Sequence, residues 1–175
     1  MIVEAKKRRE KLLSAGVPPS FLDAMEDPSA FEELAYLARY PEGFYLEMPR
    51  VIGGYSILRG YAVTPVYEDG NGDIYSVLLS SDEETRFVRF PRERDEIYKD
   101  FGADFQYMLA DLLIEYYEFA TDLSVEVLSA HGERIGCPRA SRLFKALADA
   151  EGSGARRSFE LDNEWRRDVL PGLVG

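Results

Sequence analysis

The chain has 175 residues, of which 46% are hydrophobic and 13% aromatic, and its formal net charge at pH 7 is −11. This length can bury a sizeable core, and the composition excludes an acidic disordered chain. Residues 21–138 hold 9 Lys and Arg against 24 Asp and Glu, so the central body is strongly acidic. Such a field disfavours nucleic acid and anionic membranes and favours a basic protein surface, although solubility alone also accounts for it.

The cysteine content and the N-terminal residues indicate the compartment. A single cysteine, Cys137, excludes an intramolecular disulfide framework and a thiolate-rich zinc site. The first residues, MIVEAKKRREKLL, lack the apolar run of a secretory signal, and no segment approaches the length of a membrane span. We therefore expect a cytoplasmic chain without a membrane partner.

The N-terminal 40 residues of the chain contain three helical patterns. Residues 3–14 predict a mostly charged surface helix, and residues 20–25 predict a short second helix. Asp27 and Pro28 are typical of a helix start, so residues 29–40 predict a third helix.

Aromatic and β-branched residues then dominate residues 44–90, with turn residues at short intervals. We expect four or five strands in this region. Because the connections are only a few residues long, the strands should pair antiparallel. The predicted strands are FYLEM, VIGGYSIL, YAVTPVYE, DIYSVLL and TRFVRF.

Residues 102–120 give the clearest helical pattern, with a broad apolar stripe that should cover the sheet. The opposite side of this helix should present one exposed strip of carboxylates, Asp104, Asp111, Glu115 and Glu118. Further along, residues 124–128 predict a strand and residues 138–150 a helix. A flexible link and a short tail helix around Trp165 should follow.

These elements predict an α+β fold, with a mainly antiparallel sheet of four to six strands packed against helices. We expect residues 1–175 to form a single domain. Within it, the sequence pattern separates a surface helix at 1–16, a core at 17–124 and a helical C-terminal extension at 125–175.

The stretch VYEDGNGDIYSVLL carries a row of oxygen-bearing side chains around a glycine turn. Asp69, Asn71 and Asp73 occupy the first, third and fifth positions of a calcium loop. However, Ile74 stands where that loop needs glycine, and Ser80 stands where it needs a bidentate carboxylate. The stretch therefore predicts a β-hairpin, with no metal site.

In this hairpin we expect Gly70, Asn71 and Gly72 to adopt positive φ. The following strand should then place alternate apolar residues on one face of the sheet, namely Tyr75, Val77 and Leu79. Elsewhere, the glycine-containing stretches lack the residues of a phosphate-binding loop, so no nucleotide cofactor is predicted.

Two sets of residues are candidates for catalysis. His131 precedes Cys137 by six residues, but we interpret them as a loop histidine and a small buried cysteine. Asp111, Glu115 and Glu118 are the best carboxylate set for acid–base chemistry, and a solvated helix face explains them more simply. We therefore predict no catalytic residue and no cofactor.

The stretches VPPSFLDAM, TPVYEDGNGDIYSVLL and DEIYKDFGADFQYMLADLLIEYYEF resemble the SUKH superfamily, over about residues 17–120. The resemblance implies a small α+β domain. Many members of that superfamily are bacterial immunity proteins that bind and neutralise partner toxins, and others are adaptors in larger assemblies. The superfamily has no shared catalytic set, so the resemblance assigns no active-site residue.

The function that the sequence favours is a non-enzymatic protein-binding module of the toxin-immunity kind, which occludes a basic partner protein. A small carboxylate-based hydrolase and a structural homo-oligomer that docks through Trp165 are the alternatives. We expect a monomer or a weak homodimer. The predicted partner-binding residues are Asp82, Glu83, Glu84, Asp111, Glu115 and Glu118.

Overall fold

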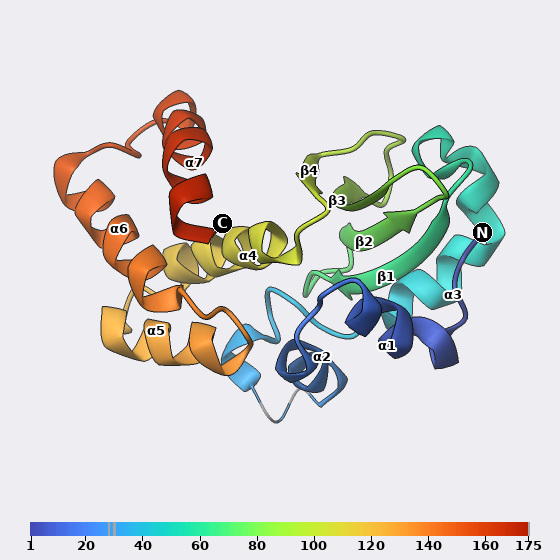
Figure 1. The fold of residues 1–175 in the computed structure, drawn as a ribbon, viewed down its shortest axis with the longest axis horizontal. Helices are drawn as coiled ribbons and strands as arrows, with labels where there is room; N and C mark the ends of the chain where they lie inside the picture. The colour runs from blue at the N-terminus through green and yellow to red at the C-terminus, as the bar shows by residue number, and fades with distance from the viewer. Residues whose placement is uncertain (28, 30, 175) are drawn as a thin grey trace. The chain divides into compact units, whose positions relative to one another are not determined.

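The computed structural model describes residues 1–27, 29 and 31–174. The chain forms two compact units, Met1–Met108 and Leu109–Gly175, which we call the sheet-bearing unit and the C-terminal unit. The described residues form helices and one antiparallel sheet, which confirms the predicted α+β class (Figure 1). The boundary between the units lies between Met108 and Leu109, within a helix, whereas the C-terminal extension was predicted to begin at residue 125.

The sheet-bearing unit contains a four-stranded meander in which each strand pairs antiparallel with the next. Short connections permit this order, because parallel pairing would need long crossovers. The strands are β1 (Ala62–Glu68), β2 (Ile74–Ser80), β3 (Thr85–Pro91) and β4 (Lys99–Gly102). The helices of this unit are α1 (Ala5–Ser14), α2 (Pro19–Glu26), α3 (Glu42–Val51) and the start of α4 (Phe105–Phe119).

The central strand β2 has the predicted alternation. Tyr75, Val77 and Leu79 lie in one buried cluster with Phe44 and Met48 of α3. In the register of the sheet, Tyr75 lies opposite the buried Phe90 of β3, and their rings meet edge to face at 5.8 Å. This face of the sheet therefore forms one apolar core with α3, as the period of two residues predicts.

Two predicted strands in residues 44–58 are wrong, because this region is α3 followed by the 3₁₀ turns η3 (Ile52–Gly54) and η4 (Ser56–Leu58). The buried Glu68 of β1 accepts backbone N–H groups of Gly43 at 3.3 Å and Phe44 at 3.1 Å. A carboxylate satisfies free N–H groups at a helix start and favours the helix dipole there. This cap comes from a residue 24 positions later in the chain.

The helix predicted for residues 29–40 is also wrong over most of its length. Within the described residues 31–40 the only helical element is the 3₁₀ turn η2 (Glu32–Leu34), and the start predicted at Pro28 lies outside the described residues. The strand β4 was not predicted, because its four residues, KDFG, carry no alternating apolar pattern.

The outer edge of β1 is covered at its two ends by two other segments of the chain. At one end, Val63 exchanges backbone hydrogen bonds with Val3 and Met1, at 2.9 and 2.8 Å. At the other end, Glu68 exchanges two with Arg39, at 3.0 and 3.1 Å. Such covering protects an edge strand from pairing with another chain.

Between these ends, the strand register shifts between Pro65 and Tyr67, which marks a β-bulge. The buried Arg8 of α1 donates to the carbonyl oxygens of Pro65 at 2.9 Å and Val66 at 2.6 Å. Its third contact is the carboxylate of Glu26 at 3.2 Å. The helix predicted to lie on the surface thus buries an arginine against the bulge.

The C-terminal unit is helical, and continues from α4 through α5 (Val125–Arg134), α6 (Ala140–Ser153) and α7 (Phe159–Val174). The strand predicted at residues 124–128 is wrong, because Ser124 caps α5 by accepting the backbone N–H of Val127. The predicted helix at 138–150 is confirmed as α6. That helix ends at Gly154, whose φ of 72° is left-handed.

No helix in the described part of the chain is long and apolar enough to span a bilayer.

Candidate functional site

The predicted partner-binding residues separate into two sets. Asp82, Glu83 and Glu84 are exposed in the turn between β2 and β3, within the sheet-bearing unit. The hydroxyl of Ser81 accepts the backbone N–H groups of Glu83 at 3.3 Å and Glu84 at 3.2 Å. This local hydrogen bonding orders the turn backbone while the three acidic side chains remain in solvent.

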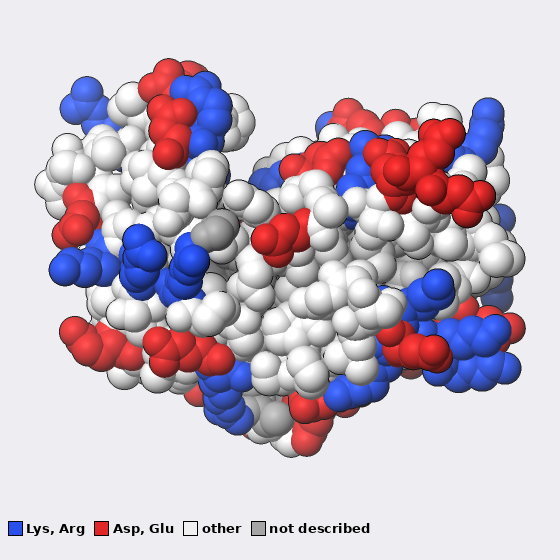
Figure 2. All heavy atoms as spheres, viewed as in Figure 1, with Lys and Arg blue, Asp and Glu red and all other residues white. Residues whose placement is uncertain are grey.

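The carboxylates of this turn differ in their partners. Glu84 accepts a hydrogen bond from the hydroxyl of Tyr61 and lies 3.8 Å from the guanidinium of Arg86. Within the described residues, Asp82 and Glu83 form no ion pair. Figure 2 shows acidic side chains gathered on the viewed face of the sheet-bearing unit.

The second set lies on α4, where the prediction of one exposed strip is wrong for Asp111. This residue is only 4% exposed, and its carboxylate accepts a hydrogen bond from Arg166 of α7 at 2.8 Å. Glu115 is half-buried. Glu118 is exposed, and it pairs with Arg156 and, at 3.7 Å, with Arg166. Arg156 and Arg166 therefore already neutralise Asp111 and Glu118, which are two of the four carboxylates of the predicted strip.

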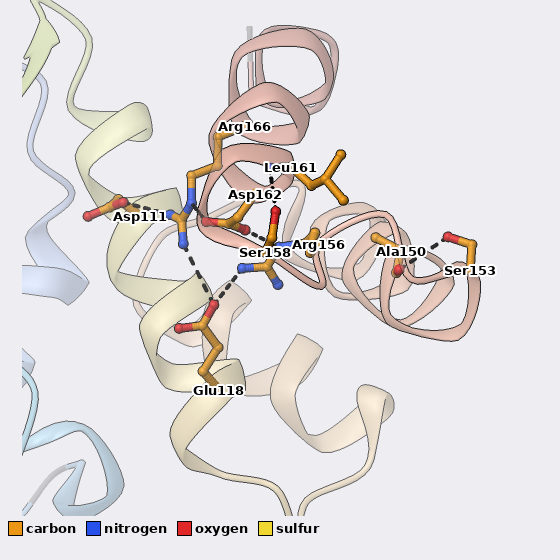
Figure 3. Close-up of polar contacts among 9 residues, drawn as sticks. All are labelled: Asp111, Glu118, Ala150, Ser153, Arg156, Ser158, Leu161, Asp162 and Arg166. Atoms are coloured by element: carbon orange, nitrogen blue, oxygen red, sulfur yellow. Dashed lines mark hydrogen bonds and ion pairs between the residues drawn. The ribbon is translucent and has the colours of Figure 1, made fainter.

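Asp162 of α7 completes this arginine–carboxylate cluster, which we define as Asp111, Glu118, Arg156, Asp162 and Arg166 (Figure 3). Arg166 donates to Asp162 at 2.6 Å one helical turn away, and Arg156 donates to its other oxygen. Figure 3 shows the guanidinium of Arg166 between carboxylates of α4 and α7. Such charge-assisted pairs are stronger than hydrogen bonds between neutral groups.

The cluster shifts the pKa values of its members. Burial raises the pKa of Asp162, but hydrogen bonds from Arg166 and Arg156 outweigh it, so that its pKa lies below the ordinary value. Burial disfavours the charge of Arg166, yet Asp162, Asp111 and Glu118 raise its pKa above the ordinary value. Both groups are therefore held in their charged forms.

A cavity of about 550 Å³ in the C-terminal unit is lined in part by residues of the cluster. Its apolar lining consists of Ala120, Leu123, Val125, Leu128 and Ala150. The polar lining comprises Tyr117, Glu118, Thr121, Glu151, Gly154, Arg156, Arg157 and Asp162.

A concave site with carboxylates beside apolar walls is the feature expected of the hydrolase alternative. Here, however, Glu118 and Asp162 are paired with arginine, and Glu151 accepts a hydrogen bond from Tyr117 at 2.6 Å. Burial and this bond to Glu151 raise the pKa of Tyr117 to about 12. The lowered pKa of Asp162 is opposite to what a carboxylic general acid requires.

His131 and Cys137 do not form the arrangement of a nucleophile and its base. His131 lies in α5, not in the loop predicted from the sequence, and its Nδ1 is 2.7 Å from the hydroxyl of Tyr116. Cys137 is buried, and burial raises the pKa of its thiol. A raised pKa favours the inert protonated thiol.

The turn between β1 and β2 is a hairpin, as predicted. One carboxylate oxygen of Asp69 accepts the backbone N–H groups of Asp73 at 2.8 Å and Ile74 at 3.0 Å, which uses this carboxylate within the turn. Across residues 1–27, 29 and 31–174, no group of three or more His, Cys, Asp or Glu side chains could hold a metal ion.

Sequence reasoning missed the basic half of the cluster. Arg156 falls in the stretch interpreted as a flexible link, and Arg166 in the short tail helix. The spacing of Asp162 and Arg166, four residues apart, was the only local signal, since it is typical of an ion pair on a helix.

The folding of α7 and of the link before it should weaken in acid. Because the pKa of Asp162 is lowered by Arg166 and Arg156 in the folded chain, the unfolded segment, which lacks these hydrogen bonds, binds the proton more readily. The stabilisation is therefore complete above the unfolded pKa and is lost as pH falls below about 4, through the lowered folded pKa. Trp165, the single tryptophan and 5.2 Å from the guanidinium of Arg156, should report this as a shift in fluorescence emission.

The matched control for this titration is Asp162→Asn, which keeps the side-chain size and removes the titrating group. Its Trp165 emission should lack the acid-dependent step seen in the wild-type chain. An identical step in both proteins would contradict the role of Asp162.

Comparison with known proteins adds no relative to these observations: the chain matches no family model, no curated protein and no solved structure.

Proposed function

We propose that this chain is a non-enzymatic protein-binding module of the toxin-immunity kind, which binds and occludes a basic partner protein. The observation that carries the proposal is the contrast between its carboxylates. Those around the cavity have arginine or tyrosine partners, whereas Asp82 and Glu83 extend into solvent without an ion pair in the described chain. Unpaired exposed charges can attract an oppositely charged protein without first losing an internal contact.

The charge of the whole sheet-bearing unit supports this function. Residues 1–108 contain 13 Lys and Arg against 20 Asp and Glu, a net charge of −7. Tyr61, whose hydroxyl contacts Glu84, places a half-buried aromatic ring next to the acidic turn. Aromatic anchors provide much of the affinity at interfaces, while surrounding charges set the association rate. The resemblance to the SUKH superfamily implies the same class of function.

The hydrolase alternative depends on the cavity of the C-terminal unit. That cavity has the volume of a small-molecule site. Asp162 has a lowered pKa and is held as an anion, however, and a hydrolase of this kind needs one carboxyl group to donate a proton. The protein-binding function therefore has the stronger support.

The test begins with affinity capture from the native cell and identification of the captured protein. Asp82→Asn, Glu83→Gln and Glu84→Gln together should reduce its association rate by on the order of tenfold at low salt, because the steering charge is lost. The wild-type association rate should also fall as salt rises. Stopped-flow or surface-based kinetics would measure both effects.

The control variant neutralises three other exposed acids of the same unit, Glu10, Glu32 and Glu33, each to glutamine. It changes the net charge equally, so it should reduce the association rate much less than the turn variant. Equal rates for the two variants would remove the turn from the interface. A partner whose binding ignores both salt and the turn would refute the proposed function.

A further inference from the structure

We infer that the face of α4 that carries Asp111 and Glu118 is a docking surface for an arginine-bearing helix of the partner, and that α7 occupies this surface until the partner displaces it. This inference rests on the proposed function, because it assumes a basic protein partner. It adds a second contact surface and specifies the chemistry of the segment that binds there.

The spacing of the two carboxylates fits a helical ligand. Asp111 and Glu118 are seven residues apart, so they lie about two turns apart on the same side of α4. One guanidinium reaches both, since Arg166 lies 2.8 Å from Asp111 and 3.7 Å from Glu118. Arg156 supplies a second guanidinium to Glu118. The structure thus shows this face already binding arginines, one of them from a helix (Figure 3).

The apolar attachment of α7 is mostly partial burial. Among the described residues of α7, only Leu170 is buried, and Phe159 at its start is 78% exposed. Pro171 lies inside the helix, where it removes a backbone donor. The neighbouring helix α6 instead buries an apolar stripe of Ala140, Leu143, Phe144, Leu147 and Ala150. Five further apolar residues of α7 are half-buried, namely Leu161, Trp165, Val169, Leu173 and Val174. Partial apolar burial and the ion pairs to α4 therefore hold α7 in place together.

The ion pairs of Glu118 are exchangeable, whereas those that Arg166 forms with Asp111 and Asp162 are largely buried. Glu118 is half-exposed, with 51% of its side chain accessible, so its attraction to arginine is weakened by salt and open to competition. The link that precedes α7 begins at Gly154, in a left-handed conformation that suits a chain reversal. A partner helix that supplies equivalent arginines can replace α7 without leaving Asp111 unpaired.

Displacement would also change the adjoining cavity. Arg156, Arg157 and Asp162 contribute to its polar lining, and Leu123 and Leu128 to its apolar lining. Removing the segment that carries these three polar residues opens the cavity and leaves its apolar residues more exposed. The partner segment should therefore be amphipathic, with arginines that reach α4 and an apolar side chain that packs against the apolar lining.

The experiment uses the full chain and a peptide probe of known composition. Arg156→Gln with Arg166→Gln should release α7, and shift the Trp165 emission towards that of a solvent-exposed indole. The probe is a fluorescein-labelled peptide of residues 155–174, which contains both arginines. Fluorescence anisotropy should show that it binds the double variant at least tenfold more tightly than the wild-type chain, where α7 competes at high effective concentration.

Two controls identify the surface. Adding Asp111→Asn and Glu118→Gln to the double variant should abolish peptide binding, and so should replacing the peptide residues Arg156 and Arg166 with glutamine. Equal affinity for the wild-type chain and the double variant would overturn the displacement. Binding that persists without the two carboxylates would overturn the docking surface.

If circular dichroism shows that the double variant does not fold, a salt titration of the wild-type chain decides the matter. The Trp165 emission should shift between 0.1 and about 1 M NaCl while the far-UV signal persists, since ion pairs are screened over this range. An unchanged emission would overturn the inference.

The proposed function and the displacement of α7 can be refuted independently. A partner that depends on the turn carboxylates but does not compete with the peptide would refute only the role of α7. A peptide result as expected, with a partner indifferent to the turn, would refute only the proposed turn interface.

Discussion

Replacement of Arg8 with alanine is expected to lower the free energy of unfolding by about 3–5 kcal/mol. Its guanidinium is 1% exposed and donates to the carbonyl oxygens of Pro65 and Val66 at the bulge in β1. Burial lowers the pKa of Arg8, and the carboxylate of Glu26 opposes this effect. Alanine would leave two buried acceptors without this donor, and a cavity beside the sheet.

The neighbouring Arg9 provides a matched control. It forms ion pairs with Asp23 and Glu26, but 38% of its side chain is exposed. Arg9→Ala should therefore cost at most about 1 kcal/mol. Urea denaturation followed by far-UV circular dichroism would measure both variants, and hydrogen exchange would localise the loss to β1. A cost for Arg8→Ala no greater than that for Arg9→Ala would contradict the role of Arg8 at the bulge.

The Gly70→Ala substitution should lower the free energy of unfolding by about 2–4 kcal/mol. A Cβ atom at this position would lie 2.1 Å from the carbonyl oxygen of Tyr36, far inside van der Waals contact. That oxygen accepts the backbone N–H of Gly70 at 2.8 Å, so the two backbones cannot separate without losing this hydrogen bond. Thermal and urea denaturation would measure the loss.

Gly53 is the control for this substitution. A Cβ atom there would meet nothing within 4 Å, and its φ is not positive. Gly53→Ala should leave stability unchanged or increase it by about 0.4–1 kcal/mol, because alanine restricts the unfolded chain. A Gly70→Ala chain as stable as this control would show that the hairpin can move away from Tyr36 at little cost.

The hairpin turn that contains Gly70 shows which features the local sequence can predict. The pattern around Asp69 predicts the hairpin correctly, since turn residues and alternating apolar residues act over short distances. Of the three positions expected to have positive φ, only Gly72 has it, at 74°. Gly70 is needed instead for its close approach to Tyr36, which lies 34 residues earlier and is invisible to local pattern.

Short apolar segments were the least predictable elements. The stretches at 44–58 and 124–128 have the composition of strands, yet they form helical structure. Segments this short are compatible with both helical and strand periodicity, so the residues that they contact in the fold determine which structure forms. For α3, Glu68 supplies the cap from β1, whereas long helices such as α4 and α6 follow from their own apolar stripes.

The sequence by itself determined the α+β class, the antiparallel order of the strands predicted in residues 61–90 and the acidic character of the chain, because these depend on composition, periodicity and loop length. Only the tertiary structure decided which charged side chains form ion pairs and which extend into solvent. Asp111 and Arg166 are 55 residues apart in the chain, and folding joins them at 2.8 Å. The turn at Asp82 folds locally and leaves its carboxylates in solvent. The energy of an ion pair depends on separation and burial in space, which a pattern of residue types does not contain.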